Sequence, residues 1–524
     1  MKTIYKILSV ILLISFSACN NEEYFELENP VLDPWLNVTD MDQAPIGAYY
    51  ALSGNGGSRT IFGGGRLGAE LYADGVALAP EGEGYGVNAD AEDVYKRTPD
   101  FEVALYDNHI FNSAYFAIGN ANGPLDFIEE NNGNPFPLED DQENVDRIRG
   151  ELLFVRAYAY YWLARMYLPA FPDDEKRLPL RLDQANSYEE AIVSDLASAN
   201  DLYPIIIQDL KDAKDFLPET FNQEIHPSAY ADGRATKFAA AALLAKVLFH
   251  TGDYDGALAE LNYVIDENDG KFDLSEDPIE AFNKTGIDRG KEVIWYYALW
   301  AGDGLTTWKH PGRPSWYNAT KRNSFDPADN GDRFVRASDS FLEAAGWINP
   351  DLSETTEALQ DKRYTQLFIR FEDFEDEINP EPRGAYEATR PYVWGWKYYR
   401  SDADRSTNIP ILRLADMYLL RAIIRANNGD EVGSLSDLNT VRNRAGLMDF
   451  TGSGDDLKEA IHLERWKEMA FEGDRLYYLQ GLEMDIPEGD RTSGAVPFNS
   501  AGLYSEIPDY EIDLNQGYSV ATGN

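Results

Sequence analysis

The chain has 524 residues, of which 44% are hydrophobic and 13% aromatic, enough to bury a sizeable core in one large or two ordinary domains. Its 46 basic and 91 acidic side chains give a formal net charge of −45, so phosphate backbones and anionic lipid would repel it. The composition argues against global disorder, against a nucleic-acid-binding protein and against electrostatic membrane binding.

Residues 1–18 predict an export signal. Lys2 and Lys6 supply a basic start, and residues 7–16 form an apolar run too short to span a bilayer. Small residues then precede Cys19, the only cysteine, which therefore has no partner for an intramolecular disulfide. The arrangement resembles a bacterial lipobox, so we expect Cys19 to be diacylated and to hold the protein on a membrane. Residues 19–45 then predict an extended tether.

Residues 53–90 are rich in glycine and predict a loop. Residues 63–68 formally match G-x-G-x-x-G, but no buried strand precedes them and no βαβ unit surrounds them. We therefore do not expect a dinucleotide site there.

Helical periodicity follows. Residues 101–130 and 144–168 predict helices, and the second is apolar on all sides from Leu152 onward except at Arg156 and Arg165, which is typical of a central buried helix. Residues 187–216 predict a helical pair that breaks near Pro204.

Residues 234–266 predict two antiparallel helices that turn at Gly252. The turn resembles that of a tetratricopeptide repeat, with Tyr254 and Ala257 at the positions which that repeat favours. One such pair leaves its own apolar face uncovered, so we expect further helix pairs.

Residues 270–400 predict a large loop-rich insertion, because helical periodicity stops and Trp, Tyr, Gly and Pro accumulate over a length too great for a passive connector. Residues 334–400 mix short helices with loops, and residues 392–396 predict a strand. Aromatic rings among amides and carboxylates suit sugars, whose C–H faces stack on flat rings. We predict these rings to bind ligand: Trp300, Trp308, Trp316 and Tyr317 of the insertion, with Tyr72 and Tyr85 of the glycine-rich loop. The alternative is that they form the insertion's own core.

Residues 411–427 predict a second central helix that stops at Gly429. Ser434 with Asp437 predicts a capping box that opens its partner helix. Residues 457–480 predict the last long helical region, and the tail from Gly481 a loop. The periodicities together predict an all-α-dominated fold.

Several blocks, spread over nearly the whole chain, resemble the SusD/RagB family of outer-membrane nutrient-binding lipoproteins of Bacteroidetes. They are Cys19 with its acidic tether, residues 149–168, residues 409–416 with 438–447, residues 464–475, and the closing pattern at residues 507–515. One departure is Asp416, which stands where the family usually has Glu.

The resemblance implies a SusD-like fold of four tetratricopeptide-like helix pairs with a looped C-terminal part laid on it. Residues 46–269 would form the N-terminal helical region, including the pair 234–266, and residues 270–524 the C-terminal region, including the insertion 270–400. The resemblance also implies a lipid-anchored protein on the surface of the outer membrane. Such a protein captures oligosaccharide or polysaccharide and delivers it to a SusC-like TonB-dependent transporter, without catalysis and without a cofactor.

The residues give the same expectation about catalysis. The five histidines show no metal-ligand spacing, and residues 326–332 resemble a calcium loop but place Ala328 where a ligand belongs, so we expect no metal site. The charged side chains in helical segments are better explained as structural ion pairs: Arg156, Arg413, Glu464, Arg465, Glu472 and Arg475. Three alternatives stay open, namely a peptide-binding member of the family, a surface glycoside hydrolase and a scaffold that binds only protein.

Overall fold

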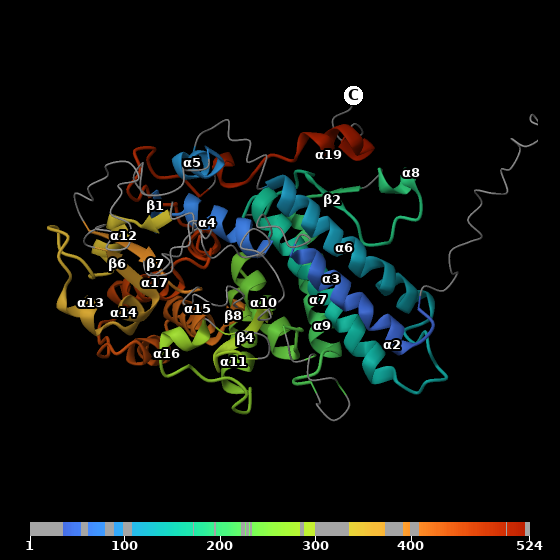
Figure 1. Cartoon of the computed structure of the whole chain (residues 1–524), viewed down its shortest axis with the longest axis horizontal. Helices are drawn as coiled ribbons and strands as arrows, with labels where there is room; N and C mark the ends of the chain where they lie inside the picture. Colours follow the sequence, from blue (N-terminus) through green and yellow to red (C-terminus); the bar gives the residue numbers. More distant parts are fainter. Residues whose placement is uncertain are drawn as a thin grey trace, which may run out of the picture.

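The structure is a computed structural model in which helices dominate, as predicted (Figure 1). It describes residues 35–53, 61–78, 89–97, 107–170, 172–192, 195–221, 226, 230, 233–282, 284, 288–298, 335–371, 391–398, 408–498 and 500–518. Within this part of the chain, no helix is long and apolar enough to cross a membrane.

The long helices form a stack in which each contacts the next along the chain, so that one helix covers the apolar face of its neighbour. Figure 1 shows the stack running from α2 and α3 at one end of the molecule to α15 and α16 near the other. The members are α2 (Val38–Met41), α3 (Gln43–Leu52), α6 (Asp107–Glu130), α7 (Gln142–Tyr167), α9 (Ala199–Phe216), α10 (Lys237–His250), α11 (Tyr254–Asp266), α15 (Leu414–Asn427) and α16 (Glu431–Arg444).

Helix α7 is the central helix that its apolar sequence predicts. It contacts α3, α6, α9 and α10, and nearly every side chain from Leu152 to Tyr167 is buried. Arg156 is one of its two charged side chains in that stretch, and its guanidinium binds both carboxylate oxygens of Asp209 on α9 at 2.8 Å. The prediction that Arg156 holds helices together is therefore confirmed.

The pair α10–α11 confirms the predicted repeat-like hairpin. Gly252 turns the chain with a φ of +81°, a conformation that glycine adopts without a steric penalty. The carboxylate of Asp253 then accepts the backbone N–H of Gly256 at 2.9 Å and starts α11. The Tyr254 hydroxyl donates to the Gly481 carbonyl at 2.8 Å, which ties the hairpin to the C-terminal part of the chain.

The second half of the chain packs a more irregular layer against this stack. It contains α17 (Asp455–Met469), α18 (Arg475–Gly481) and short helices that lie between small sheets. The short elements are η5 (Pro278–Ala281), α12 (Asp339–Ala344), α13 (Thr356–Gln360), α14 (Lys362–Leu367), η8 (Ala501–Leu503) and α19 (Asp509–Leu514).

The described strands form two-stranded antiparallel sheets. The strand predicted at 392–396 is confirmed as β7. The pairs are β1 (Val76–Leu78) with β5 (Val335–Ala337), β2 (Leu178–Leu180) with β3 (Asp195–Ala197), β4 (Val293–Tyr297) with β8 (Ile409–Arg413), and β6 (Phe368–Phe371) with β7 (Tyr392–Gly395).

The N-terminal predictions were wrong in two places. The expected extended tether is helical from Val38 onward, in α2 and α3. The expected glycine-rich loop contains the π-helix η3 (Ile61–Gly65), α4 (Arg66–Tyr72), β1 and α5 (Ala89–Lys96). Close packing explains the glycine at position 65, because a Cβ there would lie 2.7 Å from the indole of Trp162 on α7.

Two further predictions were wrong in the helical segments. Helix α9 begins at a capping box formed by Ser198 and Asp201 and continues through Pro204, so the break expected there is absent. Pro204 lies early in the helix and removes only one backbone hydrogen bond. The helix expected to precede the break is only the one-turn helix α8 (Tyr188–Ala191). The helical region expected at 457–480 is broken between α17 and α18, and the tail expected to be a loop contains α19.

The capping box predicted from Ser434 and Asp437 is also wrong. Helix α16 starts one turn earlier, with Asp430 as its N-cap. Ser434 is buried and donates to the Ala422 carbonyl at 2.8 Å, and Asp437 binds Arg421. Both side chains therefore join α16 to α15 instead of capping a helix.

Candidate functional site

Most of the predicted ligand-binding aromatics lie outside the described residues, as does Cys19. These residues are Tyr85, Trp300, Trp308, Trp316 and Tyr317. The structure does describe the strands that flank the two segments in which these aromatics lie. Residues 79–88 follow β1, and residues 299–334 lie between β4 and β5.

Those junctions meet on one sheet. Strands β1 and β5 are antiparallel partners, and the last residue of β1, Leu78, lies directly opposite the first residue of β5, Val335. The last described residue before the segment that carries Tyr85 therefore lies beside the first described residue after the segment with the four other aromatics. The sequence offered no sign of this, because the two positions are far apart along the chain.

Strand β7 lies next to the same junction and brings a third segment to it. It contacts β5, and the guanidinium of Arg336 lies 5.0 Å from the ring centroid of Tyr392. Residues 372–390 connect β6 to β7, at the end where Phe371 pairs with Tyr392. Three segments of the predicted insertion and glycine-rich region thus attach around one small group of strands.

Tyr72 is the one predicted binding residue that the structure describes. Its hydroxyl donates to the Gly502 carbonyl, and the Arg97 guanidinium lies 5.3 Å from its ring centroid. Arg97 also donates through Nε to the Tyr72 carbonyl at 3.0 Å. Burial raises the pKa of Tyr72 above its usual value. Tyr72 thus joins α4 to the residue that follows α5 and to the C-terminal tail.

Two tryptophans that flank the predicted site belong to the core. Trp295 on β4 is 2% exposed, and its indole N–H donates to the Gly233 carbonyl at 2.8 Å. Trp394 on β7 is 1% exposed and lies 5.8 Å from the ring of Tyr392. Both rings are therefore core side chains.

The charged residues of the C-terminal blocks form a buried network centred on Arg413. Its guanidinium binds Glu292 at 2.6 Å, Glu468 at 3.0 Å and Glu472 at 2.7 Å. Burial alone would raise the pKa of Glu472, but Arg413 and Lys397 lower it below its usual value. The carboxylate is therefore held ionised by its neighbours and is not poised to exchange a proton.

The remaining charged residues of those blocks are also paired, which confirms the structural interpretation of the pattern. The contacts are Glu464 to Arg363 and Arg442, Arg465 to Asp416 and Asp474, and Arg475 to Asp74. The unusual Asp416 also binds Lys246 at 2.6 Å. In the part of the chain that the structure describes, no group of three or more His, Cys, Asp or Glu side chains is placed to hold a metal ion.

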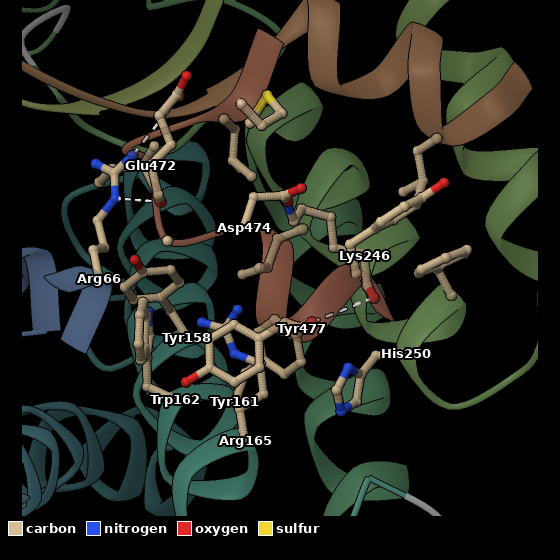
Figure 2. Close-up of a pocket in the computed structure, with 18 of the residues that line it drawn as sticks. Arg66, Tyr158, Tyr161, Trp162, Arg165, Lys246, His250, Glu472, Asp474 and Tyr477 are labelled. Carbon is tan, nitrogen blue, oxygen red and sulfur yellow. Dashed lines mark hydrogen bonds and ion pairs between the residues drawn. The ribbon is translucent and has the colours of Figure 1, made fainter. Parts of the chain in front are cut away.

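A cavity of about 60 Å³ lies where α7, α10 and α18 meet β8, α15, α17 and α4 (Figure 2). The guanidinium of Arg165, at the C-terminal end of α7, lies between three rings in this cavity. The distances to the ring centroids are 4.2 Å for Tyr161, 4.1 Å for Trp162 and 4.2 Å for Tyr477. The sequence did single out Arg165 as a charge in an apolar helix, but it gave no indication of a cavity.

Comparison with known proteins gives matches along most of the chain. A family described as "Starch-binding associating with outer membrane" matches residues 83–249, and one described as "SusD family" matches residues 354–479. "SusD-like protein P2" of Formosa agariphila is 26% identical over 98% of this chain and 95% of its own length.

Solved structures match over a similar extent. A SusD superfamily protein from Bacteroides vulgatus has a TM-score of 0.70 at 20% identity, covering 92% of this chain and 98% of its own. A SusD-like carbohydrate binding protein from the same species has a TM-score of 0.69 at 18% identity, covering 93% and 98%. These likenesses show a shared fold.

Proposed function

Since the chain belongs to the SusD/RagB family, we propose that it captures oligosaccharide or polysaccharide at the cell surface and delivers it to a partner SusC-like TonB-dependent transporter. The observation that carries the proposal is the match of residues 83–249 to a family described as starch-binding and outer-membrane-associated. A SusD-like carbohydrate binding protein of the same fold adds support.

The proposed ligand site consists of Trp300, Trp308, Trp316 and Tyr317 with Tyr85 and Tyr72. Its support is the attachment of residues 79–88 and 299–334 at paired positions of the β1–β5 sheet. A ring that buries roughly 100 Å² against a sugar contributes about 2.5 kcal/mol, so two or three rings, after the cost of association, predict dissociation constants on the order of micromolar to millimolar. Weak capture of this kind suits a protein that must release its ligand.

The proposed location is the outer membrane, with the lipid on Cys19 as the only anchor. Two or three long acyl chains hold a protein on a bilayer essentially permanently, since each buried methylene contributes about 0.8 kcal/mol. The proposed role is binding without catalysis. The participation of Glu464, Glu472 and their arginine partners in buried ion pairs supports it, because these carboxylates already have structural partners.

Calorimetric titration with a panel of oligosaccharides tests the proposal. The chain from residue 20 onward would be compared with Trp300→Ala, Trp308→Ala and Trp316→Ala. Phe116→Ala is the matched control, because this ring is 52% exposed on α6 and lies outside the proposed site. We expect one glycan to bind the wild type and the control, and to bind at least one tryptophan variant tenfold or more weakly.

Other results would overturn parts of this proposal. If no glycan binds while a peptide does, the ligand class is wrong. If a glycan binds and all three tryptophan variants bind equally well, the function stands and the assigned residues are wrong. Release of reducing sugar by the pure protein would contradict the proposed absence of catalysis.

A further inference from the structure

The cavity around Arg165 has an excess of positive charge, in a chain whose net charge is −45. Four cationic side chains line it, and two carboxylates do: Arg66, Arg165, Lys246 and Arg465 against Glu472 and Asp474. The charges of this lining decide what the cavity could hold, because a buried charge without a counter-ion is costly.

Three of the four cations already have anionic partners. Lys246 binds Asp416 at 2.6 Å, and Arg465 binds Asp474 at 2.7 Å. Arg66 lies 3.8 Å from Glu472 and donates its Nε proton to the Glu472 carbonyl at 2.8 Å, a contact drawn in Figure 2. These contacts leave Arg165 as the cation of the lining to be explained.

Arg165 is only 8% exposed, and among the described residues no carboxylate forms an ion pair with it. Its Nε proton has no acceptor in the part of the chain that the structure describes. Three aromatic rings cover the guanidinium, and such cation–π contacts stabilise the cation without supplying a negative charge. Figure 2 shows the guanidinium between the rings of Tyr161, Trp162 and Tyr477.

Another N–H donor along the cavity wall also lacks a partner. Among the described residues the indole N–H of Trp162 has no acceptor, although the side chain is only 3% exposed. Burial and the nearby Arg165 charge lower the pKa of His250 to about 3, so this imidazole is neutral and adds no charge to the wall. The wall therefore presents the N–H groups of Arg165 and Trp162, while its two carboxylates are already paired.

We infer that this cavity binds a small monovalent anion of about the size of chloride, with the Arg165 guanidinium as its counter-ion. The unpaired positive charge of Arg165 sets the sign and the valence. The volume of about 60 Å³ admits an ion of this size, since one water molecule needs only roughly 10–15 Å³ of such space. The anion would join α7 to the elements around it and act as a structural ligand, and nothing in this inference depends on which nutrient the protein captures.

Bromide tests the inference, because it replaces chloride and scatters anomalously. We expect a crystal of the wild-type protein grown with bromide to show an anomalous peak in the cavity at hydrogen-bonding distance from Arg165. In solution, with gluconate replacing bromide at constant ionic strength, we expect the unfolding temperature to rise with bromide. Above the dissociation constant, each tenfold increase in bromide should lower the unfolding equilibrium constant about tenfold.

Arg165→Met should abolish both the peak and the bromide-dependent rise. Arg149→Met is the matched control, since this arginine lies on the same helix over the ring of Phe216, at 4.7 Å, and away from the cavity; it should respond as the wild type does. The inference would be overturned if the wild-type cavity held water and no bromide. It would also be overturned by an anomalous peak without a bromide-dependent rise in unfolding temperature, or by an equal rise in Arg165→Met. If Arg165→Met does not fold, the two wild-type measurements decide.

Discussion

Glu70 gives the folded protein a pH dependence that a single amide substitution should remove. Its carboxyl group lies on α4, is 2% exposed, and accepts the backbone N–H of Gly473 at 2.7 Å. Burial raises its pKa from 4.5 to about 7, although the Gly473 hydrogen bond and the charge of Lys397 oppose the rise. The folded protein therefore holds a proton there at a pH where the unfolded chain has released it.

The sign and the size of the effect follow from this shift. A carboxyl whose pKa is higher in the folded state contributes stability that is complete below the unfolded pKa of 4.5 and is lost as the pH rises through about 7. A displacement from 4.5 to about 7 corresponds to a loss of about 3 kcal/mol of unfolding free energy, as an upper limit.

Glu70→Gln keeps an oxygen acceptor for the Gly473 N–H and removes the ionisation. We expect the variant to be more stable than the wild type by up to about 3 kcal/mol at about pH 8, and the difference to fall below about 1 kcal/mol at about pH 5. Urea denaturation followed by intrinsic fluorescence at several pH values measures it. The exposed Glu130→Gln, measured beside it, accounts for the loss of one carboxylate from the surface.

A difference between Glu70→Gln and wild type that stays constant across this pH range would refute the reasoning, because it would mean that the folded carboxyl ionises as the unfolded one does. A variant that is less stable than the wild type at about pH 8 would refute it as well. In that case the ionised carboxylate would be stabilised by its surroundings, and the burial of Glu70 would not be the dominant influence.

Three further predictions concern the network, the backbone and the anchor. Arg413→Met should cost about 3–5 kcal/mol of unfolding free energy, because it leaves Glu472 and its neighbours buried without their main counter-ion. Lys176→Met breaks a half-exposed pair with Asp201 and should cost less than about 1 kcal/mol. Denaturant titration compares the two variants. Gly473→Ala should destabilise by at least about 2 kcal/mol, since Gly473 has a φ of +71° and its new Cβ would lie 2.8 Å from the Cα of Arg66. Gly252→Ala, with a φ of +81° and no neighbour within 4 Å, should cost only about 1 kcal/mol, and equal losses would contradict the clash. Cys19→Ser should move the protein from the membrane fraction to the soluble fraction, and its retention on the membrane would contradict a lipid anchor.

Several features of this protein could be predicted from the sequence because they depend on local periodicity. The hydrophobic spacing in α7, α10 and α15 predicted the helices, and the turn at Gly252 predicted the hairpin between α10 and α11. Isolated arginines in segments expected to be apolar helices predicted buried ion pairs, because a buried cation needs acceptors. Such pairs are found for Arg156 in α7 and for Arg413, although Arg413 ends strand β8 and the helix expected from residue 411 begins at Leu414. The blocks that resemble the SusD/RagB family predicted the fold.

The glycine-rich stretch at 53–90 shows why local reasoning failed elsewhere. Glycine has a low propensity for helices and strands, so the sequence predicted a loop. The structure instead forms η3 and α4 there, with Gly65 against the indole of Trp162 and Gly473 against the backbone of Arg66. Tertiary packing against distant residues outweighed the local propensity.

The sequence alone thus determined the helical stack and the kind of residue that holds it together, because periodicity and the cost of burying a charge are properties of short segments. Only the tertiary structure decided that Leu78 lies opposite Val335, that Glu70 is buried next to Gly473, and that Arg165 remains a cation without an ion-pair partner among the described residues. These features arise where segments far apart in the chain meet. Burial and charge pairing there depend on every neighbour at once, and no single stretch of sequence carries that information.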